Sequence, residues 1–115
     1  MPLLVLIVDD NELNAKLARD VLAAAGMSTL SATTAADGLA LACEHLPDLI
    51  LMDVHLPDLD GAEAARRLKE DTRTATTPVV ALTALTAVPG GFDGHLEKPF
   101  DVDAFPEQVR GYCRS

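Results

Sequence analysis

Residues 3–10 read LLVLIVDD, an uninterrupted apolar run that ends on two adjacent aspartates. Such a run, without polar alternation, is typical of a strand that is buried on both faces of a parallel sheet. Two later apolar runs end on Met52-Asp53-Val54 and Leu82-Thr83-Ala84, and Glu97-Lys98-Pro99 follows the short segment 94–96. Because ligands bind beyond the carboxyl ends of the strands in an open parallel sheet, these four signals are predicted to meet at one edge.

Strands and helices are predicted to alternate along the chain. The predicted strands cover residues 3–8, 28–32, 48–53, 78–83 and 94–96, and the second of them is half polar, as expected near a sheet edge. This alternation indicates an α/β fold with a parallel sheet, in which right-handed crossovers place helices on both faces. The first helix lies between Asn11 and Gly26 and carries four apolar residues at helical spacing, Leu13, Leu17, Val21 and Ala24.

Three further helices follow from the pattern. The second is predicted to begin near Thr34, to stop at Pro47 and to turn four residues inward, Ala36, Leu39, Cys43 and Leu46. The third runs from Asp60 to about Asp71. Both helices begin with a pair that resembles a capping box, Thr34 with Asp37 and Asp60 with Glu63. A closing helix presents one apolar face, made by Val102, Phe105, Val109 and Tyr112.

Length and composition indicate a single domain over residues 1–115. A formal charge of −9 argues against binding to the nucleic-acid backbone, and one Tyr with no Trp argues against an aromatic platform for stacked bases. No apolar run approaches the roughly 20 residues that a membrane helix needs, and none resembles a signal peptide. Cys43 and Cys113 lack metal-ligand spacing and are predicted to be reduced thiols, so we expect a cytoplasmic protein.

The predicted sheet edge gathers three carboxylates, one hydroxyl and one ammonium, from Asp9, Asp10, Asp53, Thr83 and Lys98. Clustered carboxylates repel one another unless a cation joins them, and hard divalent cations, Mg²⁺ above all, suit oxygen ligands. A carboxylate can attack phosphorus and form an acyl phosphate, which makes Asp53 the candidate nucleophile. Asp9 and Asp10 are the candidate metal ligands, although either Asn11 or Asp10 could cap the following helix.

In order and spacing, the four signals resemble those of response-regulator receiver domains, the phosphoacceptor half of two-component signalling. The resemblance covers residues 3–114 and implies a flavodoxin-like, doubly wound sheet of five parallel strands in the order 2-1-3-4-5. It also implies that Asp53 takes a phosphoryl group from a phosphohistidine on a histidine kinase or a histidine phosphotransfer protein. Such a domain is a signalling phosphoacceptor that supports its own phosphotransfer and autodephosphorylation, and is not classed as an enzyme.

The same resemblance assigns roles to the other site residues. It implies that Thr83 and Lys98 contact the phosphoryl group, that the peptide bond before Pro99 is cis, and that the His55 backbone carbonyl joins the three aspartates around Mg²⁺. Because no output domain fits in 115 residues, we expect a stand-alone receiver that acts on a downstream protein target. The sequence does not decide whether this domain forms a weak homodimer. Partner docking is expected on the first helix, at Asn14, Leu17, Ala18 and Val21.

The sequence departs from the family pattern in two places. His95 stands three residues before Lys98, where the family usually has Tyr or Phe, so a conventional aromatic switch is in doubt. Between Thr83 and Lys98 the chain is short for a helix, and Pro89-Gly90-Gly91 disfavours one strongly. We predict that the family's fourth helix is missing and that a loop around residues 86–94 replaces it.

Three other functions stay open from sequence. A phosphorylation-independent interaction module of the same fold would not need the full set of acids, threonine and lysine. An aspartyl-phosphate phosphatase usually carries a second Asp two residues after its nucleophile, where this chain has His55. A flavodoxin-like electron carrier would need a phosphate-binding loop after the first strand, where Asp9 and Asp10 would repel the FMN phosphate.

Overall fold

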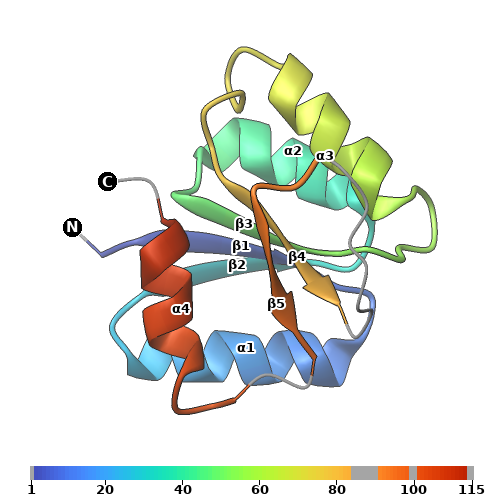
Figure 1. Cartoon of the computed structure of the whole chain (residues 1–115). Helices are drawn as coiled ribbons and strands as arrows, with labels where there is room; N and C mark the ends of the chain where they lie inside the picture. The colour runs from blue at the N-terminus through green and yellow to red at the C-terminus, as the bar shows by residue number, and fades with distance from the viewer. Residues whose placement is uncertain (1, 84–90, 99–100, 114–115) are drawn as a thin grey trace.

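The apolar runs of the sequence form the strands of one parallel sheet. The computed structural model of the protein describes residues 2–83, 91–98 and 101–113. The strands are β1 (Leu4–Val8), β2 (Ser28–Ala32), β3 (Leu49–Asp53), β4 (Val79–Thr83) and β5 (Gly94–Glu97). All four pairings are parallel and the order is β2-β1-β3-β4-β5 (Figure 1). The predicted α/β class and strand order are therefore confirmed.

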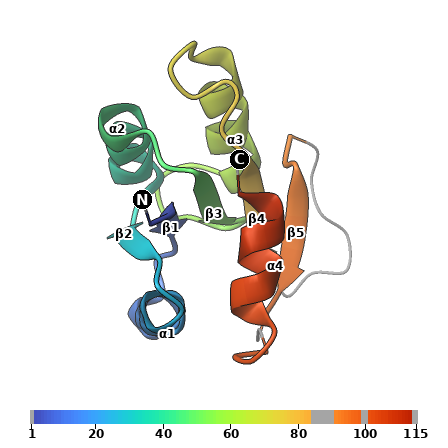
Figure 2. The ribbon, with the colours of Figure 1, turned by 90° about the vertical axis from the view of Figure 1, so that its left-hand side faces the viewer.

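Successive residues of the central strands face opposite sides of the sheet, and helices cover both sides. In β1, Val5 and Ile7 belong to one apolar core, whereas Leu6 and Val8 belong to the other. The helices are α1 (Glu12–Ala24), α2 (Ala35–His45), α3 (Gly61–Glu70) and α4 (Phe105–Tyr112). Figure 2 shows α1 and α4 on one face and α2 and α3 on the other. Burial on both faces explains why these strands lack polar alternation.

Side-chain caps set the starts of three helices, as the sequence predicts. The Asn11 side chain accepts hydrogen bonds from the Leu13 and Asn14 amides at 3.0 and 3.1 Å, and Thr34 accepts one from the Asp37 amide at 3.2 Å. Asp60 caps α3 through the Ala62 amide at 2.9 Å. Each bond satisfies a backbone donor that lacks a partner within the helix.

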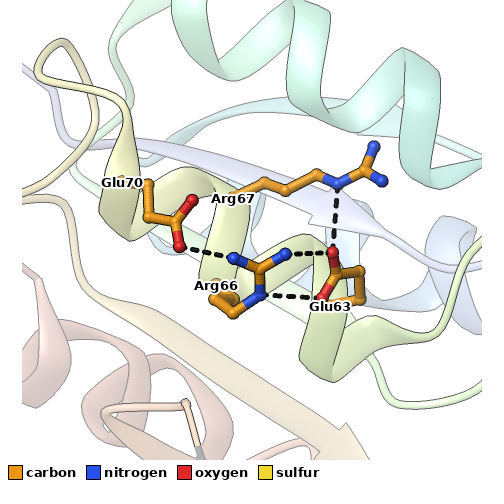
Figure 3. A network of polar contacts seen from close by, with 4 residues as sticks. All are labelled: Glu63, Arg66, Arg67 and Glu70. Carbon is orange, nitrogen blue, oxygen red and sulfur yellow. Dashed lines mark hydrogen bonds and ion pairs between the residues drawn. The ribbon is translucent and has the colours of Figure 1, made fainter.

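The capping box predicted for Asp60 and Glu63 forms only in part. Figure 3 shows that the Glu63 carboxylate turns along the helix toward two guanidinium groups, accepting from Arg66 Nε at 2.8 Å and from Arg67 Nε at 3.4 Å. Arg66 also pairs with Glu70. These exposed ion pairs at helical spacing support α3 weakly and keep its charged face in solvent.

The buried faces of α1 and α2 differ from the apolar spacing in the sequence. On α1 the buried residues are Ala15, Ala18 and Leu22, while Leu13 is 79% exposed. On α2 most of the inward set predicted from sequence is wrong, because the buried residues are Ala35, Gly38 and Ala42. Of the four predicted residues only Leu39 packs against the core, from a partly buried position. A Cβ atom on Gly38 would lie 2.7 Å from Val8 Cγ2, so α2 approaches the sheet too closely for larger side chains. Close packing, and not hydrophobicity, selects this face.

The loop predicted to replace a fourth helix lies in the connection between β4 and β5, which the structure describes only in part. Residues 84–90 lie outside the described part of the chain, and with them most of the loop predicted around residues 86–94. In residues 91–93, which are described, there is no helix, and the described residues as a whole form four helices. The cis peptide bond predicted before Pro99 also falls outside the described residues. Among the helices described, none is long and apolar enough to cross a membrane.

Candidate functional site

The ends of β1 and β3 bring three carboxylates together. Asp9 follows β1, Asp10 follows Asp9, and Asp53 is the last residue of β3. One carboxylate oxygen from each of the three lies within 4.8 Å of the others. Asp9 is fully buried, the Asp53 side chain is 14% exposed, and Asp10 faces solvent. The predicted acidic cluster therefore forms a small site that opens on one side.

Lys98 reaches this cluster from the residue after β5. Its Nζ lies 2.8 Å from Asp9 Oδ2 and 3.3 Å from Asp53 Oδ2, and its side chain is 16% exposed. The Lys98 amide donates to the Thr83 carbonyl at 2.9 Å, which fixes the lysine beside the end of β4. One ammonium thus compensates two nearly buried carboxylates.

The remaining carboxylate oxygens are held by the backbone that follows each strand. Asp9 Oδ1 accepts from the Asn11 amide at 2.9 Å, and Asp53 Oδ1 accepts from the His55 amide at 3.0 Å. Both bonds span two residues, a pattern by which Asp orders its own turn. The two carboxylates are therefore fixed in orientation, each with its Oδ2 directed at the lysine.

Burial dominates the electrostatics of Asp53. It raises the pKa of the carboxyl above its ordinary value, a shift that the His55 amide and Lys98 only partly oppose and that Asp9 reinforces. Burial alone would lower the pKa of Lys98, but the Asp9 and Asp53 carboxylates outweigh it and raise that pKa. The site thus has more negative charge than one lysine neutralises.

This donor set suits a hard divalent cation. Asp9 Oδ2 is buried, and besides the Lys98 ion pair it has no hydrogen-bond partner among the described residues. A buried carboxylate oxygen with unused acceptor capacity is costly unless a cation or donor meets it. Three convergent carboxylates with one side open to water match the preference of Mg²⁺ for a few oxygen ligands and several waters.

Thr83 is nearly buried at the end of its strand, whereas His95 does not face inward. Thr83 ends β4, is 4% exposed, and pairs in register with Glu97. Met52 and Asp53 pair with Ala81 and Leu82, so Thr83 lies one residue beyond the pairing of β3. His95 lies on β5 with an exposed side chain. The structure thus brings Asp9, Asp10, Asp53 and Lys98 together beside the end of the strand that carries Thr83.

Gly61 lets helix α3 begin directly behind Asp53. A Cβ atom at this position would collide with the backbone oxygen of Asp53 and lie 2.9 Å from Val54 Cα. The Gly61 amide donates to the Val54 carbonyl at 2.9 Å, which closes the loop after β3. Because backbone atoms cannot yield as side chains do, only glycine fits here.

We expect Gly61→Ala to lower the free energy of unfolding by about 2 kcal/mol or more, the upper part of the usual cost of overpacking. Gly111→Ala is the matched control, because a Cβ there meets nothing within 4 Å. Gly111 lies inside α4, so its replacement should stabilise by about 0.5–1 kcal/mol. Urea unfolding of both variants measures the difference. Equal stabilities would contradict the proposed fit of Gly61.

We expect Lys98→Met to lower the metal-free free energy of unfolding by about 2–4 kcal/mol, since the variant leaves a buried carboxylate without its counter-charge. Lys16→Met is the control: its ion pair with Asp20 is as short, at 2.7 Å, but both side chains are more than 60% exposed. That exposed pair should contribute no more than about 1 kcal/mol. Urea unfolding in EDTA checks both values. A small loss for both variants would mean that Lys98 does not compensate Asp9.

Comparison with known proteins agrees with this geometry. The family model of the response regulator receiver domain matches residues 5–110. The polar-differentiation response regulator DivK of Brucella anthropi is 41% identical to the chain, over 97% of each protein.

Solved structures of the same kind superpose closely. A putative response regulator from Chloroflexus aurantiacus has a TM-score of 0.90 at 29% identity, covering 97% of this chain and 98% of its own. The receiver domain of a sensor histidine kinase from Pseudomonas aeruginosa, solved with a magnesium ion in its active-site cleft, has a TM-score of 0.88 at 27% identity, with coverage of 97% and 98%. Family match, identity and fold agree, and the chain belongs to the response-regulator receiver domains of two-component signalling.

Proposed function

We propose that the protein accepts a phosphoryl group from the phosphohistidine of a histidine kinase or histidine phosphotransfer protein onto Asp53. The observation that carries this proposal is the state of the Asp53 carboxylate. It is nearly buried, its Oδ1 is held by the His55 amide, and its Oδ2 lies 3.3 Å from an ammonium. A carboxylate with fixed orientation and a cationic neighbour is suited to attack phosphorus, because phosphoryl transfer depends mainly on positioning and charge neutralisation.

In the proposed transfer, an Asp53 oxygen forms a bond to phosphorus while the P–N bond to the donor imidazole breaks. The imidazole nitrogen leaves with the electron pair and takes up a proton. Lys98, already between the two carboxylates, pairs with the incoming phosphoryl oxygens, and the Thr83 hydroxyl donates to one of them. Water later attacks phosphorus and releases phosphate, which restores the Asp53 carboxylate and ends the signal.

Asp9, Asp10 and Asp53, with the His55 carbonyl, would hold Mg²⁺ in this proposal. When bound, the ion would neutralise charge on the phosphoryl oxygens and the carboxylates. The carboxylate cluster and the magnesium ion of the Pseudomonas aeruginosa receiver domain support this assignment.

The exposed apolar residues of α1 fit the docking of a histidine-bearing partner. Leu13 is 79% exposed and Leu17 is 43% exposed, whereas Ala18, one of the sequence candidates, is buried in the core. Helix α1 begins three residues after Asp9, so a partner bound to Leu13 and Leu17 would reach the site.

We propose one receiver domain over residues 1–115 that signals through a change in binding to a downstream protein.

Phosphoramidate tests the proposal, because its P–N bond reproduces the bond of the donor. With Mg²⁺, intact mass should show one added phosphoryl group per chain, and hydroxylamine should remove it, as expected for an acyl phosphate. EDTA should prevent the labelling. A chain that binds Mg²⁺ and a partner yet never gains mass would instead be a phosphorylation-independent interaction module.

A further inference from the structure

The loop between β3 and α3 is tied to helix α2 by one carboxylate. Asp58 Oδ1 accepts a hydrogen bond from the Ala35 amide at 2.8 Å, and its Oδ2 accepts one from the Ala36 amide at 3.0 Å. These partners lie 23 and 22 residues earlier in the chain. The two bonds therefore link the tip of the loop to the beginning of a different helix.

Helix α2 does not need Asp58 for its local cap. Thr34, the N-cap residue, takes the Asp37 amide through its side chain and the Gly38 amide through its carbonyl. Asp58 takes the two amides that precede these, at the position where a helix also favours negative charge. Those two bonds lower the pKa of the Asp58 carboxyl, because both amides donate to its charged form. The second cap is thus a tertiary link.

The base of the same loop is closed by its own backbone. His55 and Asp60 form an antiparallel bridge, the Gly61 amide donates to the Val54 carbonyl, and the His55 amide donates to Asp53. These bonds fix the shape of the loop but join only β3, the loop and the start of α3, the two elements that the loop connects. The orientation of the loop relative to the rest of the sheet edge therefore depends on a contact with another element.

Apolar packing also holds the loop against the core on this face of the sheet. Leu56 and Leu59, which flank the Pro57-Asp58 tip, pack against the core that contains Ala35 and Ala42. Packing of this kind tolerates small shifts, whereas two hydrogen bonds to two adjacent amides fix both position and angle. The Asp58 hydrogen bonds therefore fix the orientation of the loop relative to α2.

We propose that Asp58 is a positioning residue for the metal-binding and phosphoacceptor site: by clamping the loop to the start of α2, it holds the His55 carbonyl in place beside Asp53. The inference rests on the proposed function, because it assumes that this carbonyl is a magnesium ligand. Residues that orient ligands in this way commonly change metal affinity when they are replaced. Since Asp58 itself is exposed, we expect an effect below the usual range for such partners.

The test is Mg²⁺ titration of the full chain with matched variants. Asp58→Ala removes both bonds and should raise the Kd for Mg²⁺ about 3- to 10-fold, below the usual effect of outer-shell partners. Asp58→Asn keeps one acceptor oxygen and should give a smaller increase. Asp37→Ala is the control, because it removes the same charge from the first turn of α2 and leaves both Asp58 bonds intact. It should change the Kd less than 2-fold, as expected for an exposed charge in salt.

Amide hydrogen exchange at Ala35 and Ala36 gives a second readout that a merely structural role would not change. By reciprocity, if the clamp favours Mg²⁺ binding, then Mg²⁺ must strengthen the clamp. Mg²⁺ should therefore slow exchange at these two amides in the wild type and in Asp37→Ala, but not in Asp58→Ala.

Equal Kd values for Asp58→Ala and Asp37→Ala would overturn the inference while leaving the proposed function intact, because the wild type would still bind Mg²⁺. If the wild type showed no saturable Mg²⁺ binding, the proposed function would fail and the role of Asp58 with it. Should Asp58→Ala not fold, Asp58→Asn carries the comparison, since it preserves shape and one hydrogen bond.

Discussion

Asp53→Asn is expected to abolish phosphoryl uptake from phosphoramidate while the protein stays folded. The amide has nearly the shape of the carboxylate and can still accept the His55 hydrogen bond, but it is too weak a nucleophile to attack phosphorus. The other two carboxylates of the cluster lack this combination, since Asp9 is fully buried against Lys98 and Asp10 is exposed. Intact mass after incubation with Mg²⁺ and phosphoramidate measures the loss.

Asp20→Asn is the control for this experiment, because it removes one carboxylate from an exposed face of α1. It should be labelled to the same extent as the wild type. Circular dichroism of both variants should match the wild type. Full labelling of Asp53→Asn would place the acceptor at another residue and refute the assignment.

The variant Asp9→Asn/Asp10→Asn is expected to lose saturable Mg²⁺ binding, with affinity reduced at least about 100-fold. Two of the three converging carboxylates become neutral amides, which are poor ligands for a hard cation. Isosteric replacements are chosen because Asp9 is fully buried and Ala would leave a cavity. Calorimetric titration measures the affinity.

A second double variant separates the site from general electrostatics. Glu12→Gln/Asp20→Asn removes the same total charge from exposed positions of α1 and should retain Mg²⁺ affinity within a factor of about 2, because exposed charges are screened. If both double variants lost affinity equally, the acidic character of the whole surface, and not the Asp9, Asp10 and Asp53 cluster, would account for binding.

The strands and the strand-end carboxylates could be predicted because their signals are local. Residues 3–8 and 49–52 are apolar without interruption, which is typical of burial on both faces, and each run leads directly to an aspartate. The topology of a parallel sheet then brings such ends to one edge. The strand order 2-1-3-4-5 came from the family resemblance, since crossover rules alone allow several orders.

Other features depend on contacts between distant residues and left no local signal. The buried face of α2 is set by the close approach of Gly38 to Val8, so its fully buried positions hold the small residues Ala35, Gly38 and Ala42. Nothing in the sequence distinguishes Asp58 from an ordinary loop residue, because its partners are backbone amides more than twenty residues away. Sequence spacing does not reveal such a contact.

Identification of the phosphorylated residue tests the central assignment most directly. Borohydride reduces an aspartyl phosphate to homoserine, so treatment of the labelled protein followed by tandem mass spectrometry shows which aspartate carried the phosphoryl group. Homoserine is predicted at position 53, only after incubation with both Mg²⁺ and phosphoramidate. Homoserine at position 9, 10 or 58, or no homoserine in a chain that has gained the mass of a phosphoryl group, would contradict the proposed phosphoacceptor.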